Sequence, residues 1–145
     1  MSIEFKKITK NNWQEVISLS VNDDQTDFVA SNVFSLAQAK YEKEMVPVAI
    51  YHCKVMVGFA MYGKDPATNR IWIVRFMIDQ RFQKQGFGEA AIEHLVDLLM
   101  KTYNCTELYL SFEPDNIVAD KLYSKAGFVR TGEIEEGELV MKLSK

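Results

Sequence analysis

The segment Ile71–Leu99 constrains the fold of this chain more strongly than any other part of the sequence. It opens with Ile71–Ile78, which is apolar apart from Arg75. A nearly unbroken apolar run of this length is typical of a central strand that is covered on both faces. From Glu89 onward the apolar residues follow a helical period, with one face made of Ala91, Ile92, Leu95, Leu98 and Leu99. The segment therefore predicts a buried strand, a polar connection and a helix that packs on the sheet.

The rest of the chain predicts an α+β fold around one mixed sheet, with residues 1–145 forming a single domain. Further strands are expected at Ile3–Ile8, Val48–Cys53, Val55–Gly63, Leu108–Phe112, Val129–Thr131 and Glu138–Leu143. Helices are expected from Asn12 to about Leu19, from Ser35 to about Glu44, from Glu89 to Asn104 and from Asn116 to Gly127. Asn12 and Glu15 have the spacing of a capping box, and Val21–Asn32 is interpreted as a loop or a broken helix.

Charge and composition exclude several classes of protein. The 17 basic and 20 acidic residues give a net charge of −3, which disfavours duplex nucleic acid and tolerates a cationic substrate. No apolar run reaches the roughly 18 residues that a membrane span needs. Cys53 and Cys105 are interpreted as small core residues in a reducing compartment, so a cytoplasmic protein is expected. His52 and His94 lack the spacing of metal ligands, and no metal site is expected.

Two glycines between the central strand and the helix indicate an anion site. Gly86 and Gly88 lack Cβ atoms where a ligand approaches the backbone, and the helix start presents free N–H groups with a partial positive charge. Arg81 and Lys84 flank this turn and could contact a phosphate. The alternative is that the glycines serve chain geometry alone. Gly86–Ala91 also matches a dinucleotide fingerprint, but a polar hexamer separates it from the preceding strand, which that fold does not allow.

Two motifs in the chain occur together and in a fixed order. The segment Gln83–Gly88 has the form [QR]-x-x-G-x-[GA], and Asn116–Phe128 has the form N-x-x-A-x-x-L-Y-x-x-x-G-F. These two motifs resemble those of the Gcn5-related N-acetyltransferases, the GNAT family. The chain looks most similar to bacterial spermine/spermidine (diamine) N-acetyltransferases in Val57–Gly63, in Trp72 with Arg75-Phe76, and in Leu108–Ser111. The resemblance implies a mostly antiparallel mixed sheet, a V-shaped splay between its two central strands, and flanking helices.

The resemblance also implies acetyl-coenzyme A in the gap between those strands. Main-chain groups of Phe76, Met77 and Ile78 would pair with the pantetheine arm, and the Ile78 amide would stabilise the oxyanion. The amides around the glycine turn would hold the pyrophosphate. The full set of implied cofactor-binding residues is Phe76, Met77, Ile78, Arg81, Gln83, Lys84, Gln85, Gly86, Phe87, Gly88, Glu89, Asn116 and Ala119. Tyr123 occupies the family position of the acid that protonates the leaving thiolate.

The implied reaction is attack of a primary amine on the thioester, which needs a neutral nucleophile. An alkyl ammonium has a pKa near 10.4, so a proton acceptor is required. Val74 occupies the position where polyamine acetyltransferases commonly carry an acidic residue. The base is therefore left open among Asp23, Asp24, Asp27, Glu113 and Asp115.

The residues expected to bind the substrate are Asp23, Asp24, Tyr109 and Ser111. We expect an acetyl-coenzyme A-dependent N-acetyltransferase that acts on a polyamine or diamine and pairs as a homodimer. A peptide or protein α-amine acetyltransferase and a non-catalytic acyl-coenzyme A sensor are the alternatives.

Overall fold

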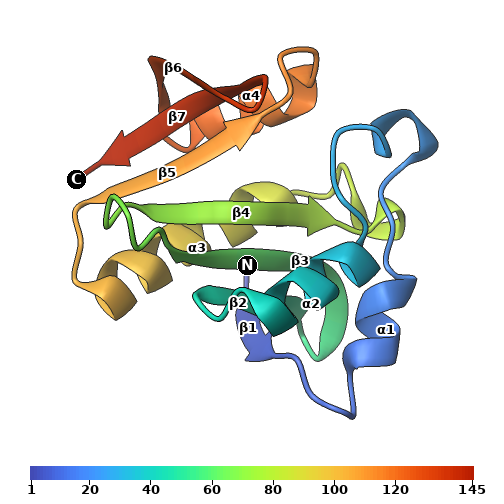
Figure 1. The fold of residues 1–145 in the computed structure, drawn as a ribbon. Helices are drawn as coiled ribbons and strands as arrows, with labels where there is room; N and C mark the ends of the chain where they lie inside the picture. Colours follow the sequence, from blue (N-terminus) through green and yellow to red (C-terminus); the bar gives the residue numbers. More distant parts are fainter.

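The computed structural model describes all of residues 1–145 and contains one seven-stranded sheet with helices on both sides (Figure 1). Its elements are β1 (Glu4–Lys7), α1 (Trp13–Ser18), η1 (Asp23–Gln25), α2 (Asn32–Tyr41), β2 (Met45–His52), β3 (Val55–Lys64), β4 (Ile71–Ile78), η2 (Gln80–Phe82), α3 (Phe87–Tyr103), β5 (Glu107–Phe112), α4 (Ile117–Lys125), β6 (Val129–Glu135) and β7 (Glu138–Ser144). None of the helices combines the length and the hydropathy needed to cross a bilayer.

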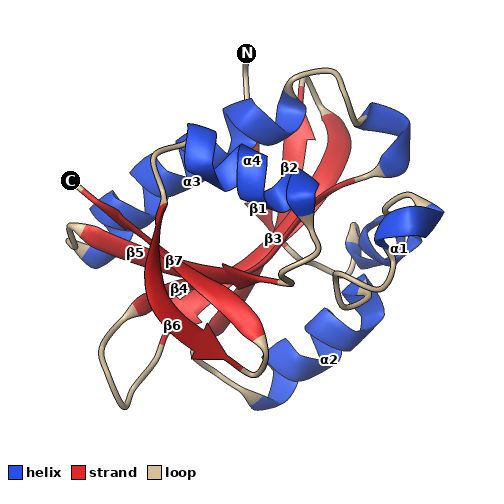
Figure 2. Cartoon of the chain, turned by 90° about the horizontal axis from the view of Figure 1, so that it is seen from above, coloured by secondary structure: helices blue, strands red, loops and turns tan.

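The strands lie in the order β1-β2-β3-β4-β5-β7-β6, and every pair except β4–β5 is antiparallel. The predicted α+β class and the mixed, mostly antiparallel sheet are therefore confirmed. Helices α3 and α4 cover one face, and α1 and α2 lie against the other (Figure 2). The larger apolar cluster lies on the α3 and α4 side, whereas a smaller one, which includes Val16, Phe59 and Met77, lies under α1 and α2.

The two central strands separate after a short stretch of pairing. β4 pairs with β5 only at Trp72 opposite Tyr109 and Ile73 opposite Leu110, although it stays paired with β3 as far as Ile78. Where β4 leaves β5 it also carries an extra residue, Val74, because Met61 pairs with Arg75 while Tyr62 pairs with Ile73. A bulge of this kind bends a strand. The implied V-shaped splay is present, and it opens toward the carboxyl ends of both strands.

Several local predictions were wrong. The cap of α2 is Ser31, whose side chain accepts from the Phe34 N–H, whereas the predicted cap, Ser35, lies inside the helix and bonds the Ser31 carbonyl. Helix α2 also ends at Tyr41, not near Glu44, because β2 already begins at Met45. Asn12 precedes α1 as expected, but its side chain bonds the Thr9 N–H and the Lys7 carbonyl, so no capping box forms.

Cys53 is exposed and is not the core residue that the sequence predicted. It occupies the β2–β3 turn, where Cys53 and Lys54 both have positive φ angles, 49° and 69°. A chain reversal of this kind needs residues in the left-handed region and leaves their side chains in solvent. Cys105 is half-buried, and both thiols are free.

Candidate functional site

A cavity of about 1430 Å³ occupies the splay between β4 and β5 and extends over the α2 side of the sheet. Strand β4 lines it from Trp72 to Ile78, and Ser111 and Phe112 line it from β5. Helix α4 and the β6–β7 hairpin supply further walls. The cavity therefore joins both faces of the sheet where β4 and β5 no longer pair.

At one end the cavity reaches the start of α3, and this end suits a diphosphate. Gly86 precedes the helix with a φ of 88°, a conformation that strains any residue with a Cβ atom. The N–H groups of Phe87, Gly88 and Glu89 donate to no protein acceptor, as expected for a first helical turn. Gly88 and Lys84 line the cavity here. Free amides, the helix dipole and one lysine together can hold an anion.

The predicted cofactor residues divide into two groups. Those that line the cavity are Phe76, Met77, Ile78, Gln83, Lys84, Gly88, Asn116 and Ala119. Those that do not are Arg81, Gln85, Gly86, Phe87 and Glu89. The side chains of the second group have other partners: the Arg81 Nε donates to Asp79 at 2.6 Å, Glu89 pairs with Lys125 at 2.8 Å, and Phe87 packs against His52. For this second group a contact with the cofactor stays a prediction.

The Asp79–Arg81 pair explains why Arg81 does not point into the cavity. The Asp79 carboxylate is almost fully buried and accepts from the backbone N–H groups of Ser20 and Arg81 as well as from the Arg81 side chain. Burial alone would raise the pKa of Asp79, but these hydrogen bonds outweigh it and hold the pKa below its ordinary value. Arg81 thus fixes the turn before α3, and its contact with a phosphate stays a prediction.

Tyr123 lies in α4 between aromatic rings, those of Phe76, Phe112 and Phe128, and also lines the cavity. No protein group forms a hydrogen bond with its hydroxyl. Burial, and secondarily the charge of Glu138, raise the pKa of Tyr123 well above its ordinary value. The phenol therefore stays protonated throughout the neutral range and can donate a proton. Its assignment as the acid stays a prediction.

The other end of the cavity is acidic. Eight carboxylate residues line the whole cavity, against four basic ones, Lys64, Arg70, Arg75 and Lys84; the acidic residues are Asp24, Glu42, Glu44, Asp65, Glu133, Glu135, Glu136 and Glu138. All of them except Asp24 come from the end of α2, the β3–β4 turn or the β6–β7 hairpin. Sequence reasoning missed these seven, although four glutamates within Glu133–Glu138 are a signal that could have been noticed.

Arg75 lies within the acidic end and is held on the α2 side. Its Nη1 donates to the Val74 carbonyl and its Nη2 to Gln38, each at 3.0 Å, while its Nε has no partner. Burial lowers the pKa of Arg75, and the charges of Glu138 and Glu42 partly oppose that effect. The guanidinium nevertheless remains charged at neutral pH, since arginine does not lose its proton in proteins.

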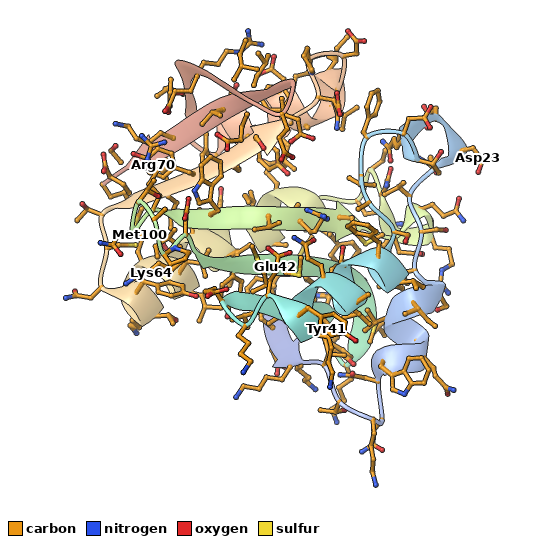
Figure 3. The ribbon with its side chains drawn as sticks, viewed as in Figure 1. Asp23, Tyr41, Glu42, Lys64, Arg70 and Met100 are labelled. Carbon is orange, nitrogen blue, oxygen red and sulfur yellow. The ribbon has the colours of Figure 1, made fainter.

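The predicted substrate residues are not all brought together. Asp24 and Ser111 line the cavity, but Asp23 and Tyr109 do not. Asp23 is exposed at the tip of its loop and lies far from Glu42 (Figure 3). Tyr109 packs against Trp72 with ring centroids 5.5 Å apart, beneath the guanidinium of Arg70. Of the other candidates for the base, Asp27, Glu113 and Asp115 lie outside the cavity, and Val74 lines it without a proton acceptor.

Residues 10–128 match the model of a family described as the acetyltransferase (GNAT) family. The chain belongs to the GNAT family. It is accordingly an N-acetyltransferase, with acetyl-coenzyme A as its acyl donor, and the cavity reaches Gly88, one of the three residues with free amides at the start of α3. No group of three or more His, Cys, Asp or Glu side chains comes together as a metal site would require.

Among GNAT relatives, the spermine/spermidine N(1)-acetyltransferase of Bacillus subtilis (strain 168) is 36% identical over 97% of both chains. The spermidine N-acetyltransferase of Vibrio cholerae, solved with CoA and spermine, is similar in fold, with a TM-score of 0.74 and 16% identity over 97% of this chain and 92% of that one. The aminoglycoside acetyltransferase AAC(6')-Ib, solved with coenzyme A, gives a TM-score of 0.82 and 16% identity over 99% and 95%.

Proposed function

We propose that this GNAT enzyme acetylates a primary amine of a polyamine such as spermidine or spermine. The observation that carries the proposal is the charge distribution of the cavity, which has free helix amides and Lys84 at one end and clustered carboxylates at the other. A carboxylate-rich cleft attracts a polycation and raises its local concentration. Similarity over 97% of the chain to a spermine/spermidine N(1)-acetyltransferase supports the same substrate class.

The proposed roles follow from the two ends of the cavity. The Phe87, Gly88 and Glu89 amides hold the pyrophosphate, and the backbone from Phe76 to Ile78, which β5 leaves unpaired, binds the pantetheine arm. The thioester supplies the activated acetyl group. Tyr123 donates the proton that the leaving thiolate needs, and the acidic end keeps the substrate's amines next to the gap.

A thiol-release assay with a panel of amines tests this proposal. Spermidine, spermine and putrescine are compared with a short peptide and an aminoglycoside at equal concentration, and acetyl-coenzyme A binding is measured separately by calorimetry. We expect turnover with spermidine or spermine to exceed turnover with the peptide. Preference for the peptide would replace the polyamine assignment. Silence across the panel despite cofactor binding would make the chain a sensor.

We also propose that two copies pair and that the enzyme works in the cytoplasm. The strand β6 is an edge of the sheet and exposes Val129 and Ile134, which a second copy could cover. Free thiols at Cys53 and Cys105 fit a reducing compartment. Light scattering after gel filtration tests the dimer, and a monomer at all concentrations would exclude it.

A further inference from the structure

We infer that Glu138 is the carboxylate that accepts the proton of the reacting amine. The inference rests on the proposed function, because it assigns the base for amine acetylation within the same cavity. Strand β4, including Val74, contains no Asp, Glu or His, so a proton acceptor must come from another element. Glu138 begins β7, two strands away from β4 in the sheet.

Burial and existing partners separate Glu138 from the other acidic residues of the cavity. Asp24, Glu42, Glu44, Glu133, Glu135 and Glu136 are exposed, and Glu133 is also paired with Arg70 at 3.2 Å. Asp65 is half-buried, but its carboxylate accepts from the Ala67 N–H within the β3–β4 turn. Glu138 is half-buried and forms no salt bridge within 4 Å. A carboxylate that is partly shielded and lacks a cation is available to an ammonium group.

The Glu138 carboxylate is also held in place beside the gap. Its Oε1 accepts a hydrogen bond from the Ser111 hydroxyl at 2.7 Å. Ser111 pairs with Val140 across β5 and β7, so Ser111 and Glu138 project on the same face of the sheet. Ser111 in turn lies one residue before Phe112, at the end of the strand that diverges from β4. One Glu138 oxygen is thereby fixed, and the other stays free for the substrate.

The titratable and charged groups around Glu138 are less suitable as proton acceptors. Tyr123 from α4 and Arg75 from β4 both sense its charge, since that charge raises the pKa of each. A protonated phenol and a guanidinium cannot take a proton near pH 7. Glu42 at the end of α2 lies near Arg75, and Glu133, Glu135 and Glu136 on the neighbouring hairpin are exposed to solvent. No histidine lines the cavity.

The reaction needs two proton transfers, and Glu138 and Tyr123 can each carry out one of them at the gap. The substrate ammonium loses two protons before it becomes an amide. Glu138 takes the first and releases it to solvent through the open cavity, which frees the lone pair of the nitrogen. The nitrogen then bonds the thioester carbon, and the carbon–sulfur bond breaks. Tyr123 gives its proton to the sulfur, and the second proton of the nitrogen restores the phenol.

The test compares Glu138→Gln with Glu15→Gln, a matched loss of charge at an exposed residue outside the cavity. Glutamine can still accept from Ser111, so we expect unchanged thermal unfolding and an unchanged KM for acetyl-coenzyme A. The kcat with spermidine should fall about 10²–10⁴-fold in E138Q and by less than about threefold in E15Q. Glu138→Asp should restore part of the loss.

The pH profile separates a base from a residue that only attracts the substrate. In E138Q the free amine alone can react, so kcat/KM should rise about tenfold per pH unit between pH 7 and 9, below the ordinary amine pKa. The wild-type profile should be flatter over that range. A kcat of E138Q within threefold of the wild-type value would overturn the inference, and so would a loss of activity by the same factor at every pH. The proposed function would stand in both cases. If the wild-type protein acetylates no amine, both the inference about Glu138 and the proposed function are wrong.

Discussion

The two ends of the cavity are built in different ways. The diphosphate end, at the start of α3, is formed by one continuous segment, Gln83–Glu89, which has a positive φ at Gly86 and free N–H groups in the first turn of the helix. The acidic end consists of side chains from α2, the β3–β4 turn and the β6–β7 hairpin, which are far apart in the sequence. A backbone site tolerates changes in most of its side chains, whereas the acidic end can change its substrate through single substitutions. Under the proposed function, the first end would hold the acyl donor and the second would select the amine.

Tyr123 lines the cavity between Phe76 and Phe112, and its substitution should lower the rate as strongly as that of Glu138. Tyr123→Phe removes one buried hydroxyl that has no protein partner, so we expect equal or slightly higher thermal stability. The kcat should fall about 10²–10⁴-fold, because the thiolate loses its proton donor, with little change in either KM. Steady-state kinetics with calorimetry of acetyl-coenzyme A binding measures these effects. A fall in cofactor affinity that matches the fall in rate would mean that Tyr123 positions the cofactor instead.

Gly88→Ala should damage the diphosphate end alone. A Cβ atom at residue 88 would meet Ile78 and Leu122 at 3.7–3.9 Å, an ordinary contact, and alanine favours a helix by up to about 1 kcal/mol. We therefore expect a stable or stabilised protein in which KM for acetyl-coenzyme A rises about tenfold or more, since the methyl group obstructs hydrogen bonds to phosphate that contribute roughly 1.5–3 kcal/mol.

The matched control is Gly132→Ala, where no atom lies within 4 Å of the added Cβ. Gly132 has a φ of 89° on the exposed β6 edge, so alanine there should lower stability through strain and leave KM unchanged. An unchanged KM in Gly88→Ala would show that the phosphate does not approach this turn.

The contrast between the ends also explains what the sequence could predict. The turn at Gln83–Gly88 and the strand Ile71–Ile78 were recognisable because their chemistry lies in consecutive residues. The partial pairing of β4 with β5 followed only from the family resemblance, and the bulge at Val74 was not predicted. The interaction of Ser111 with Glu138 joins residues 27 positions apart, and no local pattern indicates it.

Local ambiguity accounts for the remaining errors. Ser31 and Ser35 are equally suitable caps by residue type, and the choice of Ser31 depends on tertiary packing that buries Ser35 under the sheet. The pairing of Arg81 with Asp79 was also not predicted, because the burial of the Asp79 carboxylate, which makes a partner necessary, is visible only in the structure.

The exposed glutamates of the hairpin should have a smaller effect that depends on salt. The double variant Glu135→Gln/Glu136→Gln should lower kcat/KM for spermidine about threefold to tenfold at low ionic strength, and the loss should largely disappear at 1 M salt, where the Debye length is about 3 Å. Glu15→Gln/Glu93→Gln is the control, because it changes the net charge equally at exposed positions outside the cavity. Equal losses in both variants would mean that overall charge, not the acidic end, attracts the amine.

The smallest effect is expected at Asn116, where two roles can be separated by two substitutions. Its Oδ1 accepts from the Ala119 N–H at 3.1 Å and caps α4, and the residue also lines the cavity. Asn116→Ala should lower the free energy of unfolding by about 1 kcal/mol through loss of the cap. Asn116→Asp keeps an acceptor at the helix start, so its stability should match the wild type, while its negative charge should raise KM for acetyl-coenzyme A a few-fold if the cofactor passes close by. Chemical denaturation and cofactor titration distinguish the roles. A wild-type KM in Asn116→Asp would mean that Asn116 serves only as a cap for α4. The cofactor would then be held by the backbone of β4 and by the turn before α3.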